Sequence, residues 1–399
     1  VLVCGFWHVV SPPGIVLFLF GYTSDVRLSG ISIKFNKPTK TMTKYTKLVA
    51  LLPLIPLAGC MNMDNMNATQ PMLNINYPAA YVVNAEGNSL SVIDLTGQQV
   101  KETISFGDAS MTGMNMSNMI MWPHHIYLSP DGSKLGIGVP GMDLSAGHTG
   151  GTTGMNGRVL VVNPVTGQTA QNQQTPVMNH NAVFSADGTE IWTSQMDMTG
   201  KVLVYNASTM ALKNTITVGM EPAEVTMSSN GQYAFVANGM SNSVSVIKVS
   251  DKSVAKTIAV GEDPVGAWPG ADGRMYVDNE KGQSISVIDV NTLSVVETVK
   301  LGFTPGYAAY HPTRNELWVS QAGTGNKVVI FERMNGAWMK MGEVMTGLDA
   351  HAIVFTKDGA TAYITNQGAA TVSVLDVAKR TKIKDISVGK KPNGIVLKY

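Results

Sequence analysis

The strongest constraint on the fold is a repeated stretch of sequence, whose clearest copy is residues 234–261, AFVANGMSNSVSVIKVSDKSVAKTIAVG. Each copy has an apolar segment ending near Asn, a turn rich in Gly, Ser and Asn, an alternating segment of the SVSVIKV kind, and a segment ending in Val-Gly. Alternation of apolar and polar residues predicts β-strands. The period of roughly forty residues is typical of solenoids and propellers, and the strand content favours propellers.

Seven copies of the alternating segment can be aligned between Tyr81 and the last residue: Ser89–Leu95, Arg158–Asn163, Lys201–Asn206, Ser243–Lys248, Ser284–Asp289, Lys327–Phe331 and Thr371–Asp376. In most copies an earlier apolar segment runs into Asp-Gly or Asn-Gly, which favours a hairpin because both residues tolerate positive φ. Each copy therefore supplies four antiparallel strands, and the chain is predicted to be all-β, a seven-bladed β-propeller. The first copy lacks its opening strand, so we expect Lys391–Leu397 to complete blade one and close the ring.

Three of the apolar segments, Tyr81–Asn84, Phe235–Asn238 and Tyr363–Asn366, together with the alternating segments that follow them, resemble the YVTN family of β-propeller repeats. The resemblance covers Tyr81–Tyr399 and implies the propeller fold. It does not imply one activity, because proteins of this family have varied surface and periplasmic roles. Blade two departs from the pattern, since Leu135–Val139 has Gly where other copies have an aromatic residue.

The N-terminal region predicts a lipid anchor. A short basic region follows Met42, the apolar run Leu48–Leu57 is too short to span a bilayer, and Leu57-Ala58-Gly59-Cys60 resembles the bacterial lipoprotein cleavage box. That resemblance implies acylation of Cys60 as the new N-terminus. We therefore expect residues 1–41 to be upstream translation, 42–59 a signal peptide, 60–76 a Met-rich flexible tether and 77–399 the propeller. The alternative is an ordinary membrane anchor or buried strand with a chance Cys.

The expected location is the cell envelope, at the outer membrane and facing the periplasm, because Met61 stands where an inner-membrane retention signal would have Asp. Acyl chains anchor a protein without a spanning helix. The formal net charge of +1 gives no electrostatic case for binding nucleic acid.

The repeat also places histidines. Seven residues before the turn Asp of blades two, three and seven stand His124, His180 and His351, at one equivalent position. The innermost strand of a blade lines the axial channel, so this position is expected to form a ring at the channel mouth. The same count gives ordinary residues in the other blades: Asn393, Ala223, Val265 and Gly306. His125 and Glu224 stand beside the ring, whereas His311 is expected on the opposite face.

Converging imidazoles at a channel mouth predict a transition-metal site for copper or zinc. His148 and several methionines fall in loops of the same face, and the candidate thioether ligands are Met142, Met155, Met196 and Met198. Thioether sulfur favours copper over zinc. The insertion 141–157 is expected to cover the mouth as a lid.

Two alternatives remain open at this point. One is a scaffold that binds a protein or a cell-wall ligand on the His/Met face, with Met as adaptable contact surface. The other is a metal-dependent hydrolase or lactonase in which Glu224 acts as base on a metal-bound water. No nucleophile elbow or phosphate-binding Gly loop with the required context occurs in the sequence.

Overall fold

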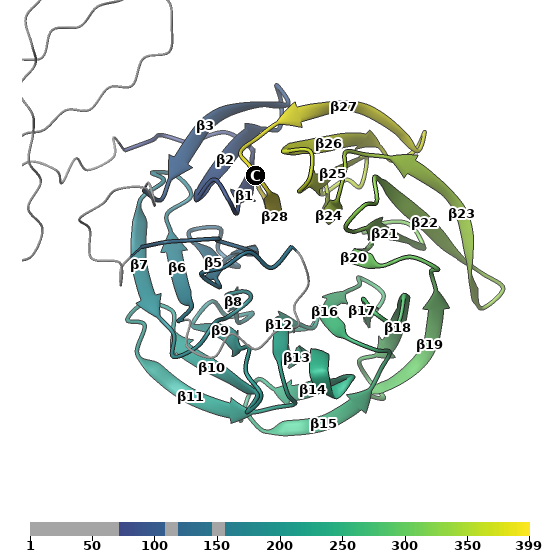
Figure 1. Ribbon diagram of the computed structural model, residues 1–399, viewed down its shortest axis with the longest axis horizontal. Coiled ribbons are helices and arrows are strands. Elements are labelled where there is room, and N and C mark those ends of the chain that lie inside the picture. Colours follow the sequence, from purple (N-terminus) through teal and green to yellow (C-terminus); the bar gives the residue numbers. More distant parts are fainter. Residues whose placement is uncertain (1–71, 108–118, 146–155) are drawn as a thin grey trace, which may run out of the picture. The chain divides into compact units, whose positions relative to one another are not determined.

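Seven four-stranded antiparallel sheets surround a central axis in the computed structural model (Figure 1). The structure describes residues 72–107, 119–145 and 156–399, all within the compact unit Ala68–Tyr399. Within these ranges the only helical element is the 3₁₀ helix Gly239–Ser241, and no helix is long and apolar enough to cross a membrane. The prediction of an all-β, seven-bladed propeller is confirmed.

The strands follow the chain blade by blade. Blade one contains β28 (Pro392–Lys398), β1 (Ala79–Asn84), β2 (Ser89–Asp94) and β3 (Gln99–Ser105). Blades two and three contain β4 (Ile126–Leu128), β5 (Leu135–Val139), β6 (Arg158–Val162), β7 (Thr169–Gln174), β8 (Val183–Phe184), β9 (Glu190–Gln195), β10 (Lys201–Asn206) and β11 (Leu212–Thr217). Blades four and five contain β12 (Pro222–Met227), β13 (Tyr233–Asn238), β14 (Ser243–Lys248), β15 (Val254–Ala259), β16 (Pro264–Pro269), β17 (Arg274–Asn279), β18 (Ser284–Asp289) and β19 (Ser294–Lys300). Blades six and seven contain β20 (Pro305–Tyr310), β21 (Glu316–Gln321), β22 (Lys327–Met334), β23 (Ala337–Met345), β24 (Ala350–Phe355), β25 (Thr361–Asn366), β26 (Thr371–Asp376) and β27 (Thr381–Ser387).

The C-terminal strand closes the ring. β28 pairs antiparallel with β1, with Tyr81 opposite Val396 and Ala79 opposite Lys398, so the last strand of the chain is the innermost strand of blade one. Every blade thereby has four strands, as expected from the missing opening strand of the first copy. The first strand of each blade faces the axis and the fourth forms the rim (Figure 1).

Burial follows the position of each strand in its blade. The second and third strands are almost completely buried because neighbouring blades cover both of their faces, as in β1 and β2. The rim strands are largely exposed, and most have one buried residue near the end of the strand, such as Ile216 in β11 and Ile258 in β15. The core is thus a ring of apolar layers between blades.

A buried Asn terminates the second strand in four blades and explains part of the repeat. In blade four, Asn238 Nδ2 donates to Ser243 Oγ at 3.3 Å and to Ser245 Oγ at 3.1 Å, the two serines of the alternating strand. The Val-Gly end of the previous blade packs on this Asn, and in blade five a Cβ at Gly261 would lie 2.6 Å from Asn279 Cγ. The repeated Asn, Ser and Gly therefore take part together in one contact between consecutive blades.

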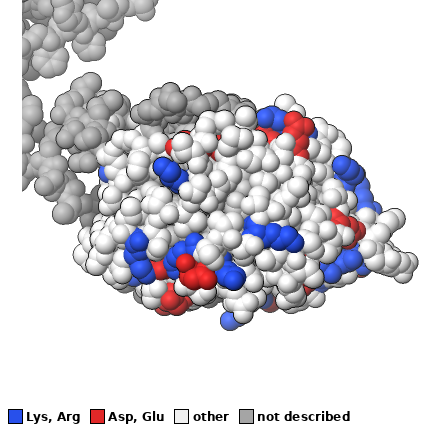
Figure 2. All heavy atoms as spheres, turned by 90° about the horizontal axis from the view of Figure 1, so that it is seen from below, with Lys and Arg blue, Asp and Glu red and all other residues white. Residues whose placement is uncertain are grey.

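Lysines, arginines and acidic residues are interspersed on the face of the molecule in Figure 2, and neither sign forms a large patch there. Uncharged residues cover most of this face. The distribution agrees with the low charged content of the chain, 14%.

Candidate metal centre

Four histidines and one glutamate meet at the channel mouth. His124 and His125 precede β4, His180 precedes β8, Glu224 lies in β12 and His351 in β24. All five side chains are buried, with relative exposures between 0% and 7%. The structure therefore brings together the three register-matched histidines, the adjacent His125 and Glu224 from four different blades.

The imidazole rings lie close to one another. The ring centroid of His124 lies 4.3 Å from that of His180 and 6.2 Å from that of His351, while His125 lies 5.2 Å from His180 and 5.4 Å from His351. The four rings therefore form one cluster.

Two glycines in blade two make room for this approach. Gly138 stands in β5, and a Cβ there would lie 2.5 Å from the carbonyl oxygen of His180 and 2.5 Å from the Cα of Asn181. Gly136 is similarly close to the carbonyl oxygen of Ala182, at 2.7 Å. The departure of blade two from the aromatic pattern thus lets the backbone that carries His180 lie against the blade that carries His124 and His125.

Glu224 lies beside two of the imidazoles. Its Oε1 lies 3.3 Å from Nδ1 of His125 and 3.2 Å from Nδ1 of His180, and its Oε2 accepts a hydrogen bond of 3.3 Å from the Tyr127 hydroxyl. Burial raises the pKa of Glu224 well above its usual value, and the charge of Asp278 raises it further, while the Tyr127 hydrogen bond opposes the shift. A cation beside this carboxylate would favour its ionised form.

The nitrogen and oxygen atoms form two groups, each compact enough to hold a metal ion. His124, His125 and His351 form one group, and His125, His180 and Glu224 another, in which the candidate ligand atoms all lie within 4.8 Å of one another. Tetrahedral zinc with bonds of about 2.0–2.1 Å separates neighbouring ligand atoms by about 3.3–3.4 Å. The separations of 3.2 and 3.3 Å around Glu224 are close to this spacing.

Asn393 supports His124 from the closing strand. Its Nδ2 lies 2.8 Å from His124 Nε2, and its own carbonyl oxygen accepts a hydrogen bond of 2.7 Å from the Thr365 hydroxyl. Outer partners of this kind fix the orientation of metal-binding histidines. The blade-one ring residue thus contacts the cluster although it is not a histidine.

An aromatic wall beside the cluster was not predicted from the sequence. Trp268 in β16 and Tyr307 in β20 are stacked with centroids 3.8 Å apart, and the His125 ring lies 5.8 Å from Trp268. The buried Asp278 accepts hydrogen bonds from Trp268 Nε1 at 2.7 Å and from the Gly266 amide at 3.0 Å. The available signal was Asp278 itself, an acidic residue inside a strand where the aligned blades have Val83 or Ala237.

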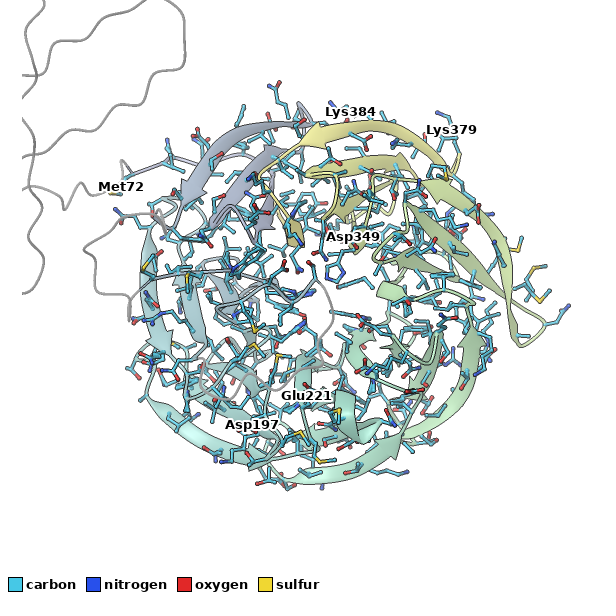
Figure 3. All side chains as sticks on the ribbon, in the orientation of Figure 1. Met72, Asp197, Glu221, Asp349, Lys379 and Lys384 are labelled. Atoms are coloured by element: carbon cyan, nitrogen blue, oxygen red, sulfur yellow. The ribbon has the colours of Figure 1, made fainter. Side chains whose placement is uncertain are left out.

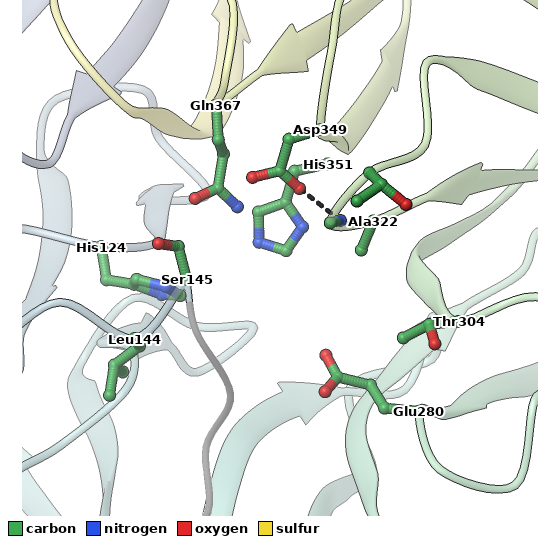
Figure 4. A pocket seen from close by; sticks show the side chains of 11 residues that line it. His124, Leu144, Ser145, Glu280, Thr304, Ala322, Asp349, His351 and Gln367 are labelled. Atoms are coloured by element: carbon green, nitrogen blue, oxygen red, sulfur yellow. Dashed lines mark hydrogen bonds between the residues drawn. The ribbon is translucent and has the colours of Figure 1, made fainter.

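A cavity of about 290 Å³ opens above the cluster, and His124 and His351 belong to its lining (Figure 4). Glu280, Thr304 and Gln367 line its sides. Asp349 lies close to the axis of the ring, and Figure 3 shows it there, far from the rim residues Lys379 and Lys384. Burial raises the pKa of Asp349 above its usual value.

The described part of the insertion 141–157 lies at the mouth. Leu144 is buried in an apolar cluster with Met196 and with the ring residues Ala223 and Val265, and Met142 packs against this cluster. This segment, which follows strand β5 of blade two, therefore contacts residues of blades four and five. The remainder of the predicted lid, residues 146–155, lies outside the described ranges.

The other predicted ligands have different positions. Met196 is buried in the apolar cluster just described, and Met198 is 57% exposed at the surface. His148, Met155 and Cys60 lie outside the described residues. His311, expected on the opposite face, follows β20, where its Nε2 lies 2.9 Å from the Gly359 carbonyl oxygen.

No protein-family model matches the chain, and no curated protein matches its sequence. Similar solved structures include a periplasmic gluconolactonase from Pseudomonas aeruginosa, with TM-score 0.62 and 17% identity over 81% of this chain and 99% of that chain. A putative 6-phosphogluconolactonase from Bacteroides fragilis has TM-score 0.63 and 14% identity over 81% and 99%. Dihydro-heme d1 dehydrogenase NirN has TM-score 0.56 and 13% identity over 83% and 78%. At these identities the similarity shows the β-propeller fold.

Proposed function

We propose that this protein binds a transition-metal ion through the His/Glu cluster at the channel mouth, as a lipid-anchored propeller of the cell envelope. The observation that carries the proposal is that four buried imidazoles and one buried carboxylate form two compact triads that share His125. Burying a carboxylate is costly unless a cation or hydrogen bonds compensate it. A divalent ion bound by the same imidazoles would supply that compensation.

The proposed ion is copper, with zinc as the alternative. Imidazole binds both, and the Irving–Williams order places copper(II) above zinc for a given set of ligands. The thioethers supply less support than the sequence suggested, because Met198 is exposed and Met196 packs among apolar side chains. The preference for copper therefore rests on the nitrogen ligands.

The hydrolase alternative has less support from the position of its expected base. Glu224 Oε1 lies beside His125 and His180, its Oε2 accepts a hydrogen bond from Tyr127, and Glu224 is not among the described residues that line the cavity. It is therefore better placed to orient imidazoles than to deprotonate a water in the cavity. The scaffold alternative, in which a protein or cell-wall ligand binds on the His/Met face, does not explain why histidines and a glutamate are buried together at the channel mouth.

Calorimetric titration of the purified metal-free protein with Cu²⁺ and Zn²⁺ tests the proposal. We expect binding with one ion per chain and a dissociation constant below about 1 µM, since multidentate nitrogen sites bind these ions tightly. Replacement of His124, His180 and His351 together by Ala should weaken binding by at least about a hundredfold, because only His125 and Glu224 of the cluster remain.

The control is His311→Gln, which also removes a buried histidine but lies outside the cluster. It should bind the ion as the wild type does, once its fold has been verified by circular dichroism. Micromolar or tighter binding that persists in the triple variant would refute the site, as would the lack of such binding in the wild type.

A further inference from the structure

Blade four has methionine at two neighbouring loop positions. Met220 stands in the connector that enters the blade, and Met240 stands in the 3₁₀ helix between β13 and β14. The two loops are joined because the Gly239 amide donates a hydrogen bond of 3.0 Å to the carbonyl oxygen of Glu221. The same hydrogen bond joins the corresponding residues of blades one, five, six and seven, so Met220 and Met240 have equivalent positions in those blades.

The side chains at these two equivalent positions meet in other blades. In blade one they are Lys390 and Glu86, and Lys390 Nζ lies 3.2 Å from Glu86 Oε1. In blade seven they are Leu348 and Gly368, and a Cβ at Gly368 would lie 3.0 Å from Leu348 Cγ. The shared backbone therefore directs the two positions toward each other. In blade four both positions hold a thioether.

A third methionine lies in the adjoining loop of blade three. The Glu221 amide donates a hydrogen bond of 2.9 Å to the carbonyl oxygen of Asp197, so Met198 and Met220 follow and precede the two bonded residues (Figure 3). With covalent bonds of about 1.2–1.5 Å, this hydrogen bond places the Cα atoms of Met198 and Met220 within about 8 Å of each other. Met side chains are unbranched and have three rotatable bonds, so they can close such a separation.

All three methionine side chains reach solvent. Met198 is 57% exposed, Met220 40% and Met240 47%, so none of them fills the core. A single exposed apolar side chain is ordinary in a protein, whereas a contiguous group marks a binding surface. Thioether sulfur is a soft ligand that suits copper(I).

We propose that Met198, Met220 and Met240 together form a surface site for copper(I), separate from the His/Glu cluster. The site uses no imidazole and no carboxylate, so it does not rest on the proposed function. Its ligands favour the reduced ion, and its exposure lets the ion exchange with the surroundings.

The test uses the full chain with ¹³C-labelled methionine methyl groups and Ag⁺ as the probe, in chloride-free buffer. Ag⁺ stands in for copper(I) because it has the same charge and softness and is stable in air. The methyl resonances are assigned with single Met→Leu variants. Those of Met198, Met220 and Met240 should shift with one common midpoint, because each methyl group is bonded to a candidate ligand atom.

Met345 is the internal reference for a single exposed thioether. It is 51% exposed at the end of β23 and lies opposite Lys327. Its methyl resonance should shift only at an Ag⁺ concentration at least about tenfold higher, because several ligands held together bind one ion more tightly than one ligand does.

The double variant Met220→Leu, Met240→Leu removes two sulfur atoms and nearly keeps the side-chain volume. The midpoint of the Met198 resonance should then rise at least about tenfold, because Met198 is left as a single thioether. The matched control is Met334→Leu, Met345→Leu, which removes two exposed thioethers from opposite ends of the hairpin of β22 and β23. In this control the Met198 midpoint should stay within about twofold of the wild type, since the replaced residues lie in another blade.

Three results would overturn the site. They are the lack of a common midpoint for the three resonances, a common midpoint no lower than that of Met345, and an equal rise of the Met198 midpoint in both double variants.

The variant with His124, His180 and His351 replaced by Ala separates this site from the His/Glu cluster. It retains the three methionines, so their common Ag⁺ midpoint should stay within about twofold of the wild type. Loss of the shifts in this variant would refute a separate site. Failure of the wild type to bind Cu²⁺ or Zn²⁺ would refute the His/Glu cluster alone.

Discussion

The buried carboxylate of Asp278 has no role in the proposed ligand set, yet it positions the aromatic wall next to it. One oxygen accepts hydrogen bonds from Trp268 and from the Gly266 amide, while the side chain has no exposure to solvent. Burial raises the pKa of Asp278 well above its usual value, with a further contribution from the charge of Glu280. The native state therefore retains a proton that the unfolded chain loses.

This difference predicts a pH dependence of stability. Above the unfolded pKa of about 3.9, and up to the raised native pKa, the native state binds more protons than the unfolded state. The free energy of unfolding should then fall as pH rises, by at most about 1.4 kcal/mol per pH unit. Asp278→Asn removes this titration, so its stability relative to the wild type should increase as the pH rises above about 4. Urea unfolding of both proteins in the presence of a chelator measures the difference.

A carboxylate with the opposite shift provides the control. Hydrogen bonds from the Ser253 hydroxyl and amide lower the pKa of Asp251, so its ionised form favours the native state above the unfolded pKa. Asp251→Asn should therefore lose stability relative to the wild type as pH rises through that range. Parallel pH profiles for wild type and Asp278→Asn would contradict the assigned shift.

The site could be located from the sequence to the extent that the strand register fixes it. His124, His180 and His351 occupy one position of the repeat, and an equivalent position in a propeller is an equivalent point on the ring. Trp268 and Tyr307 could not be found in this way, because their contact depends on side-chain length across two blades. The register likewise could not distinguish Met196, which is buried, from Met198, which is exposed.

At the scale of the strand, the repeat predicted the existence and order of the elements better than their bounds. β14 has the predicted limits. In blade six, β22 and β23 extend to eight and nine residues, and the sequence did not indicate this extension because the apolar alternation ends at Phe331. The third and fourth strands share a one-residue register shift in all blades, for example between Val246 and Ile247. Such bulges increase local twist and have no clear sequence signature here.

The innermost strands of blades two and three are shorter than the others. β4 has three residues and β8 has two, whereas β12, β16, β20 and β24 have six each. The missing length is occupied by the segments that carry His124, His125 and His180. The backbone is therefore not paired as a regular strand where it carries the candidate ligands.

The closing strand supports a prediction about stability. Deleting residues 390–399 removes β28, exposes the edge of β1, and takes away Ile395 and Leu397, which are each 9% exposed. Two such side chains contribute about 1.5–3 kcal/mol each, before the lost hydrogen bonds are considered. With an unfolding entropy of about 2.1 cal/mol/K per residue, about 1 kcal/mol corresponds to about 1.5 °C in a domain of this size. The thermal midpoint should fall by about 10 °C or more, as measured by scanning calorimetry.

Removal of Tyr399 alone is the control for this truncation, because Tyr399 is 60% exposed and lies beyond the end of β28. Its midpoint should stay within about 3 °C of the wild type. An unchanged midpoint after deletion of the whole strand would mean that ring closure does not stabilise the propeller. The truncation also removes Asn393, so its effect on metal affinity has to be measured separately.

Across the whole molecule, the cluster joins blades that are far apart in the sequence. Blade seven supplies His351, blade two His124 and His125, blade three His180, and blade four Glu224, while Asn393 of blade one supports His124. An ion bound by either triad would connect two or three of these blades at the axis. Metal binding is therefore expected to stabilise the native state by mass action, because the unfolded chain has no such site.

The attachment of this propeller to the membrane is a separate proposal that rests on Leu57-Ala58-Gly59-Cys60. If Cys60 is acylated, cells of a Gram-negative bacterium that express the chain should incorporate labelled palmitate into it. Cys60→Ser should abolish the label, since the thiol is the acceptor of the lipid. Cys4→Ser is the matched control and should retain it, because Cys4 precedes the predicted signal peptide. Label that persists in Cys60→Ser, or that is absent from the wild type, would refute the anchor and leave the metal site at the channel mouth unaffected.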